Sequence, residues 1–175
     1  METMKAIAIR KSTRSYTDEP LAPEVLEKIL LAGCAAPVGR GAYDSMHLTV
    51  INTPEAMAKL AAASQGGPGG GRPGGVAFGA PVLVVVSVKS SPMPALDVAN
   101  AACVTENMII AATDLGVGSV YVFGPANMIK NTEGLAAELG IPEGYAPEAA
   151  VCLGIPTEPL TVERDLTFKI TVNYI

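Results

Sequence analysis

The sequence contains a single histidine, His47, and no tryptophan. A zinc site built on histidine needs further ligands, and no second histidine is available to supply one. A Ser-His-Asp hydrolase would have to use His47, yet the chain has no Gly-x-Ser-x-Gly turn. His47 lies in an apolar stretch that predicts a strand, where a packed or edge histidine is the better interpretation. The sequence therefore predicts no metal site and no catalytic acid or base among its side chains.

Cysteines and long apolar runs are also scarce. The three cysteines, Cys34, Cys103 and Cys152, lie in apolar segments without Cys-x-x-Cys spacing, which predicts buried, reduced thiols in a cytoplasmic protein. The longest apolar run, 80–86, falls far short of the ~20 residues of a membrane span. The first ten residues lack the apolar region of a signal peptide. These features favour a cytoplasmic protein without a membrane partner.

Apolar residues are nevertheless abundant, at 49% of the chain with a mean hydropathy of +0.36. That surplus predicts a subunit interface, because soluble monomers rarely expose large apolar patches. The net charge of -5 argues against nucleic acid as a partner. At 175 residues, the chain is expected to form one domain, residues 1–175.

Seven glycines crowd residues 66–75, and Gly69, Gly71 and Gly74 match the Gly-x-Gly-x-x-Gly pattern. A dinucleotide-binding turn must follow a strand and open a helix, whereas this segment follows a predicted helix and leads into a strand. We therefore interpret it as a mobile flap or a flexible connection, in which Arg72 is more plausibly solvated than bound to an anion.

Helical and strand patterns alternate along the chain, which predicts an α/β or α+β sandwich. The residues from 82 to 86 are a continuous branched apolar run, typical of a strand buried on both faces. The tail alternates apolar and polar residues, and a terminal strand of this kind often pairs outside its own core. Helices are predicted at Met4–Ile9, Pro23–Ala35, Pro54–Ala63 (capped by Thr53), Ala95–Leu115 and Ala126–Leu139, and strands at Met46–Asn52, Ala80–Lys89, Ser119–Phe123, Ala149–Gly154 and Leu166–Ile175.

The basic stretch, Arg10–Tyr16, places three of the chain's twelve Lys and Arg residues within five positions, among hydroxyl residues. Guanidinium groups and hydroxyls together suit a phosphate. Composition alone favours a solvated turn instead. Glu106, on the predicted long helix, is likewise interpreted without a functional role, as part of a polar stripe that faces solvent or lies at a dimer interface.

The order of four motifs resembles the nitroreductase family of flavin mononucleotide (FMN) enzymes. The basic stretch is similar to the family's Arg-Arg/His-Ser-x-Arg/Lys-x-Phe, with Tyr16 in place of Phe. Ala35–Pro37 resembles its Ala-Pro-Ser, and 106–119 looks like its long dimer helix with the following Leu-Gly-Leu-Gly-Ser. Residues 139–145 and 151–156 are similar to its Gly-Ile-Pro-x-Gly and Leu-Gly-Tyr-Pro.

This resemblance implies an α+β homodimer with a mostly antiparallel central sheet flanked by helices, FMN at the interface and a C-terminal strand exchanged between subunits. It also implies residue roles. Arg10, Lys11 and Ser12 would bind the FMN phosphate and ribityl chain, and Arg14 would lie by the pyrimidine edge, where positive charge favours the reduced flavin. Pro37, Val38 and Gly39 of the partner subunit would contact the ring. The backbone of Val122, Phe123 and Gly124 would face flavin N5, and Arg164 would reach the phosphate.

The implied activity is ping-pong hydride transfer from NADH or NADPH through flavin N5 to a nitroaromatic, quinone or other small acceptor. Two alternatives remain open at this point. In residues 36–45, the positions that hold Ser, Asn, Gln and Trp in the family pattern hold other residues, which motivates a non-enzymatic flavin- or nucleotide-binding protein. A structural dimer in which the basic stretch only caps a helix is the third interpretation.

Overall fold

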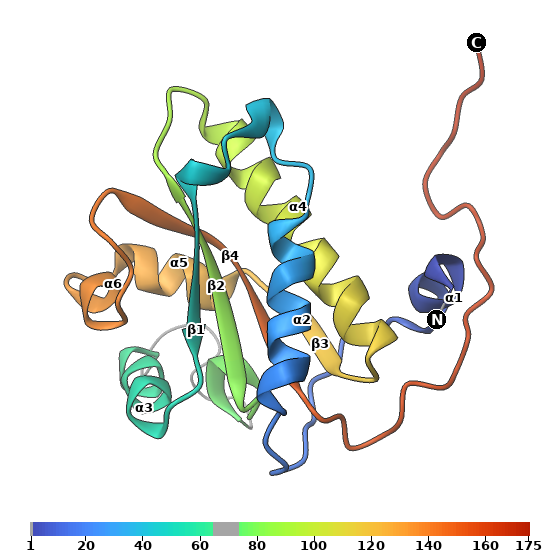
Figure 1. Cartoon of the computed structure of the whole chain (residues 1–175), viewed down its shortest axis with the longest axis horizontal. Coiled ribbons are helices and arrows are strands. Elements are labelled where there is room, and N and C mark those ends of the chain that lie inside the picture. Colours follow the sequence, from blue (N-terminus) through green and yellow to red (C-terminus); the bar gives the residue numbers. More distant parts are fainter. Residues whose placement is uncertain (1, 65–73) are drawn as a thin grey trace.

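The computed structural model describes residues 2–64 and 74–175. Its centre is a four-stranded sheet in the order β1-β2-β4-β3 (Figure 1), with every neighbouring pair antiparallel. The strands are β1 (Met46–Ile51), β2 (Val82–Lys89), β3 (Gly118–Val122) and β4 (Tyr145–Gly154). The predicted α+β architecture with an antiparallel sheet is confirmed. The predicted glycine-rich segment lies outside the described residues except for its end, Gly74 and Gly75.

The central strand β2 is buried on both faces, as its sequence predicts. Val82, Val84, Val86 and Val88 belong to one core cluster, whereas Leu83 and Val85 belong to the other. Neighbouring side chains of a strand point to opposite faces of the sheet, so an uninterrupted apolar run feeds two cores. The fold is therefore a sheet covered by helices on both sides.

Two long antiparallel helices cover one face of the sheet, and three shorter ones cover the other (Figure 1). The first pair is α2 (Pro23–Cys34) and α4 (Pro94–Asp114); the second group is α3 (Pro54–Ala63), α5 (Gly124–Asn131) and α6 (Leu135–Glu138). The N-terminal α1 (Thr3–Ile9) packs against α4. Short 3-10 turns occupy Gly39–Gly41, Tyr43–Ser45 and Gly75–Ala77.

Among the helices of the described residues, α4 alone has the length and apolar composition that a membrane span requires. Its packing identifies it as a core helix. Ala101, Met108 and Ala112 are fully buried in the cluster that α4 shares with β2 and β4. The polar groups of α4 are also used within the protein: the Asp97 carboxylate accepts hydrogen bonds from the N–H and hydroxyl of Ser91.

Two predictions about helices and cysteines need correction. The helix expected over 126–139 is two helices, because Thr132 is extended and Gly134 has φ +77°, a left-handed conformation that ends a helix. Cys34 and Cys103 are exposed rather than buried, and only Cys152 is inside. The two exposed thiols lie on helices, and an apolar helical segment still has an outward face.

The C-terminal tail arm, residues 159–175, forms neither helix nor strand within the chain. It leaves the body beside α1 and extends away from it (Figure 1). Its alternating apolar side chains are exposed, with Phe168 and Ile170 each at 82% and Tyr174 at 83%. The strand predicted over 166–175 is therefore not formed inside one chain, where no neighbouring strand reaches it.

Candidate cofactor site

The basic stretch is held against the sheet by backbone pairing at both ends. Ser12 forms a parallel bridge with Ser119 of β3, and the Thr13 N–H donates to the Ser119 carbonyl at 2.9 Å. Tyr16 forms an antiparallel bridge with Pro156, immediately after β4. These contacts fix the segment at the ends of β3 and β4, so it is an ordered part of the fold and not a free turn.

Gly118 of β3 and Gly154 of β4 allow the basic stretch to pack closely against the ends of the sheet. A Cβ on Gly118 would lie 2.8 Å from Thr13 Cγ2, and one on Gly154 would lie 2.8 Å from Tyr16 Cδ1. The Tyr16 hydroxyl donates to the Thr13 carbonyl at 2.7 Å. Burial raises the pKa of Tyr16 far above its ordinary value, so the phenol stays a neutral donor. The position where the family pattern has Phe thus carries a hydroxyl that ties the stretch together.

A cavity of about 390 Å³ opens on the basic stretch, lined by residues 11–15 and by 156–158. Lys11 and Arg14 bring positive charge to it, and Ser12 and Ser15 bring hydroxyls. We call this space the basic cavity. Opposite them, the Glu158 carboxylate lies 3.4 Å from Lys11 Nζ.

Two buried hydroxyls beside the basic cavity have no hydrogen-bond partner among the described residues. They are Thr13 Oγ1 and Ser119 Oγ, on side chains that are 5% and 2% exposed. Buried hydroxyls without partners are uncommon in folded proteins and call for a ligand or water. Sequence reasoning passed over both residues, because Thr and Ser in a strand or loop carry no signal of their own.

Arg14 lies over an aromatic ring at the end of the glycine-rich segment. Its guanidinium carbon is 5.6 Å from the centre of the Phe78 ring, and Nη1 donates weakly to the Ser12 carbonyl at 3.5 Å. Phe78 has φ +56°, a strained conformation for a residue with a side chain. Phe78 was not a predicted site residue; the flanking glycines hint only at an unusual turn.

The other two predicted arginines lie at the end of α1. Arg10 follows the helix directly, and its N–H donates to the Ala6 carbonyl at 2.9 Å. Arg164 donates from Nε to Ala8 O at 3.1 Å and from Nη2 to Ile7 O at 2.8 Å. Arg164 thus caps the carbonyl end of α1, where a positive charge is favourable. Its predicted contact with a phosphate stays a prediction.

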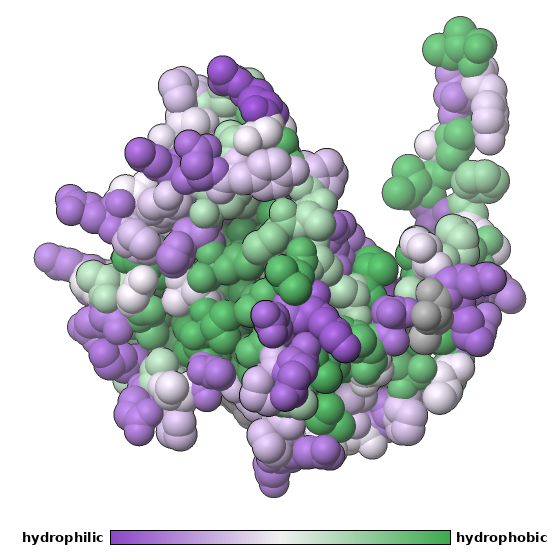
Figure 2. Space-filling model, in the orientation of Figure 1, coloured by the Kyte–Doolittle hydropathy of each residue, from purple (hydrophilic) through white to green (hydrophobic). Residues whose placement is uncertain are grey.

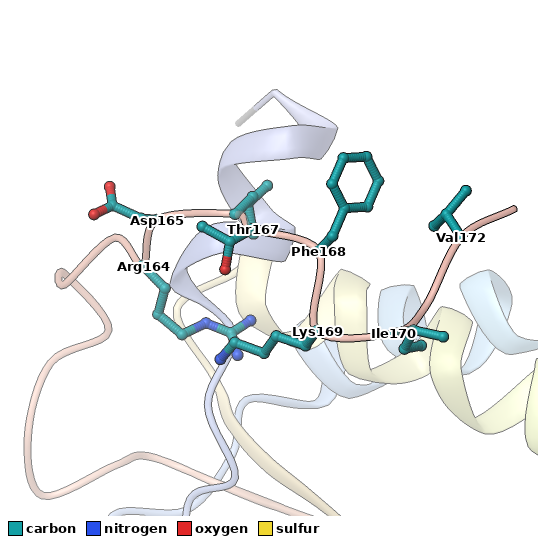
Figure 3. A pocket seen from close by; sticks show the side chains of 8 residues that line it. Arg164, Asp165, Thr167, Phe168, Lys169, Ile170 and Val172 are labelled. Atoms are coloured by element: carbon teal, nitrogen blue, oxygen red, sulfur yellow. The ribbon is translucent and has the colours of Figure 1, made fainter.

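Figure 3 shows Arg164 and Lys169 reaching toward the same space, and Phe168 and Val172 on the other side of the extended backbone. The cavity drawn there, about 480 Å³, is lined only by residues 164–172 of the tail arm. It is a bend of one extended segment. The basic cavity, which is built from two segments far apart in the sequence, is the better candidate for a ligand.

Pro37, Val38 and Gly39 lie at the other end of α2 from the basic stretch (Figure 1). The twelve residues of α2 make a helix about 18 Å long between the two segments. The Gly39 N–H donates to Asn100 Oδ1 at 2.8 Å, and Val38 is buried. One chain therefore does not bring these residues to its own basic cavity.

Val122, Phe123 and Gly124 lie where β3 ends and α5 begins. Four residues separate Phe123 from Ser119, so β3 spans about 13 Å between them. Phe123 is 58% exposed, and no atom lies within 4 Å of a Cβ built on Gly124. An elongated ligand with its anionic end in the basic cavity could follow β3 to this open backbone.

His47 packs beside Tyr145, with ring centres 5.6 Å apart, as expected for a packed histidine. Across residues 2–64 and 74–175, no three His, Cys, Asp or Glu side chains are grouped to hold a metal ion.

A protein-family model described as the nitroreductase family matches residues 7–68 and 71–155. The chain is 30% identical to a "Putative NADH dehydrogenase/NAD(P)H nitroreductase" of Methanothermobacter thermautotrophicus, over 90% of this chain and 79% of that protein. A protein of the same name from Archaeoglobus fulgidus is 32% identical, over 90% of this chain and 87% of its own length. A crystal structure of a Bacteroides fragilis nitroreductase with bound FMN superimposes with a TM-score of 0.84 at 26% identity, covering 100% and 99% of the two chains.

Proposed function

The chain belongs to the nitroreductase family, and we propose that it is an FMN-dependent oxidoreductase, driven by NADH or NADPH, that reduces a nitroaromatic, a quinone or another small acceptor. The single observation that carries this proposal is the basic cavity, found where the family resemblance puts the FMN phosphate. The similar Bacteroides fragilis structure contains FMN, and the named relatives are NAD(P)H nitroreductases.

The residues around the basic cavity fit a phosphate. The Lys11 ammonium supplies positive charge, and Ser12 and Ser15 supply donors. Two hydroxyls without partners among the described residues lie nearby: Thr13 lines the cavity, and Ser119 forms a bridge with Ser12. Arg10 precedes these residues at the end of α1, where it adds charge to the same segment.

The two predicted halves of the flavin site lie at opposite ends of α2, which supports a homodimer. One subunit would supply Arg10, Lys11, Ser12 and Arg14, with the backbone of Val122, Phe123 and Gly124. The other subunit would supply Pro37, Val38 and Gly39 to the ring. A site divided in this way is incomplete in a single chain, so pairing would be a condition of activity.

The tail arm supports exchange of a C-terminal strand between subunits. Its alternating apolar residues are exposed (Figure 2), and its backbone pairs with no strand of residues 2–64 and 74–175. On the body, β1 is an edge strand whose second side is unpaired among the described residues, whereas the outer side of β3 already pairs at Ser12. The free edge of β1 is therefore the place where a partner's tail would add by strand pairing.

Bound FMN would supply the redox chemistry itself, accepting hydride from NADH or NADPH and passing electrons to the acceptor in ping-pong order. The protein's part is to bind and orient. Arg14, held by Phe78, would place positive charge at the pyrimidine edge, and the open backbone at Phe123 and Gly124 would leave one face accessible to the two substrates. The free thiols support a cytoplasmic location.

A non-enzymatic flavin-binding protein is the second candidate, favoured by the segment that would touch the ring. Gly39 N–H is already bonded to Asn100, and the Tyr43 hydroxyl donates to Ala36 O at 3.1 Å. These polar groups are engaged within the chain, which leaves fewer of them for a substrate.

Anaerobic titration separates the candidates. Purified protein should show flavin absorbance or bind added FMN tightly, and NADH or NADPH should bleach the bound flavin within seconds. Bound FMN that keeps its colour under excess reductant would favour the non-enzymatic candidate. Absence of any FMN binding would remove both.

A further inference from the structure

An acidic residue lines the cavity that we assign to a phosphate. Glu158 Oε2 lies 3.4 Å from Lys11 Nζ, and both residues border the basic cavity. The two are 147 positions apart in the sequence. A carboxylate is an unexpected neighbour for a dianionic ligand, because like charges repel and because the carboxylate competes for the same ammonium.

The backbone holds Glu158 in this place. The Thr157 N–H donates to the Ser15 carbonyl at 3.3 Å, and the Thr17 N–H donates to the Ile155 carbonyl at 2.9 Å. Pro156 and Pro159 flank the pair Thr157–Glu158 and restrict its backbone. The segment that carries the carboxylate is thus tied to the segment that carries Lys11, and both form walls of one cavity.

The Glu158 carboxylate therefore offsets part of the positive charge that Lys11 brings to the cavity. The Lys11 and Glu158 side chains are 44% and 84% exposed, so water and salt weaken their attraction. An incoming phosphate meets the same two effects: it gains less from Lys11 and it is repelled by Glu158. A ligand without the phosphate meets neither.

Building on the proposed function, we propose that Glu158 is a specificity-determining residue: it weakens binding of the FMN phosphate and so narrows the preference of this site for FMN over riboflavin. The carboxylate opposes the phosphate directly and holds Lys11 by an ion pair. Its effect should fall mainly on the phosphate end, because its ion-pair partner, Lys11, is a predicted contact of the phosphate and ribityl chain.

The test compares Glu158→Gln with the unmodified full-length chain, after removal of any bound flavin. FMN and riboflavin are titrated separately, and binding is followed by the change in flavin fluorescence. Glu138→Gln is the matched control: Glu138 pairs with Lys59 at the same 3.4 Å, with side chains 58% and 45% exposed, between α3 and α6. It removes an equivalent ion pair from a different part of the protein.

Glu158→Gln should lower the Kd for FMN by about three- to fivefold, the range given by the stronger exposed charge pairs. The riboflavin Kd should change less than about twofold, and Glu138→Gln should alter neither. The FMN affinity of Glu158→Gln should also fall more steeply with added salt, because the cavity then carries more net positive charge.

An unchanged or weaker FMN affinity in Glu158→Gln would overturn the inference, and so would an equal gain for riboflavin. In those cases FMN still binds, and the proposed function stands. If neither the unmodified chain nor the variant binds FMN, the proposed function itself fails, and the inference falls with it.

Discussion

The Tyr16 hydroxyl donates a 2.7 Å hydrogen bond to the carbonyl of Thr13, three residues earlier. This bond folds the basic stretch back on itself while the Thr13 N–H is held by Ser119. Arg14 and Ser15 lie between Thr13 and Tyr16, so the position of their side chains depends on this hydrogen bond.

Removing that hydroxyl should loosen the basic stretch. Tyr16→Phe should lower the free energy of unfolding by about 0.5–1.5 kcal/mol, the usual net contribution of one hydrogen bond. It should also weaken FMN binding, because Arg14 would lose its fixed position. Urea unfolding and flavin titration measure the two effects. Tyr174→Phe, whose ring is 83% exposed in the tail arm, is the control for loss of a phenol. Equal stability of the two variants would contradict this role of Tyr16.

Stability should fall at alkaline pH through Cys152. Burial raises the pKa of its thiol from 9.0 to about 12. A pKa that is higher in the folded state adds stability that is fully present below pH 9 and is lost as the pH rises toward 12. Cys152→Ala should therefore show a flatter decline of unfolding free energy between pH 9 and pH 11 than the unmodified chain. Parallel curves for the two proteins in urea unfolding would refute the assignment.

Arg164 should hold the tail arm to α1. Arg164→Ala removes the two side-chain hydrogen bonds to the carbonyls of Ile7 and Ala8. We expect faster amide hydrogen exchange in Thr3–Ile9 and unchanged exchange in β2. Lys169→Ala, a cation of the same arm, is the control. If Arg164 instead contacts the phosphate, as the family resemblance implies, Arg164→Ala will lower the FMN affinity and leave exchange in Thr3–Ile9 unchanged.

Mixed dimers should reveal a site shared between subunits. A chain with Arg14→Ala is defective at the basic cavity, and a chain with Gly39→Asp is defective in the segment that would reach the partner's ring. Either alone should bind little FMN. After the two are unfolded and refolded together, about a quarter of the sites should be intact, because random pairing makes half the dimers mixed and each mixed dimer has one complete site.

Flavin fluorescence of the refolded mixture, at matched chain concentration, checks this. Gly39→Asp also places a side chain against Leu96 and Asn100, so circular dichroism must first show that this variant folds. No recovery of binding from two folded variants would mean that each chain builds its site alone.

Patterns that act over a few residues were predictable from the sequence. The apolar run of β2 required a strand buried on both sides, and Thr53 predicted the start of α3, where its hydroxyl accepts from Ala56 N–H at 3.3 Å. For the basic stretch, composition alone favoured a solvated turn, and it was the order of the family-like motifs that pointed to a phosphate. Local propensity and periodicity determine such features without reference to the rest of the fold.

Contacts between distant residues were decided only by the tertiary structure. Glu158 meets Lys11 because the pairing of Thr157 with Ser15 brings the two segments together, and nothing near either residue in sequence announces it. Arg164 donates to the carbonyl end of α1, an acceptor site that no linear motif encodes, while its contact with a phosphate stays a prediction. The tail arm is a second example. Its alternating apolar and polar residues predict a strand, but a strand forms only where the edge of another strand is close enough to pair with it.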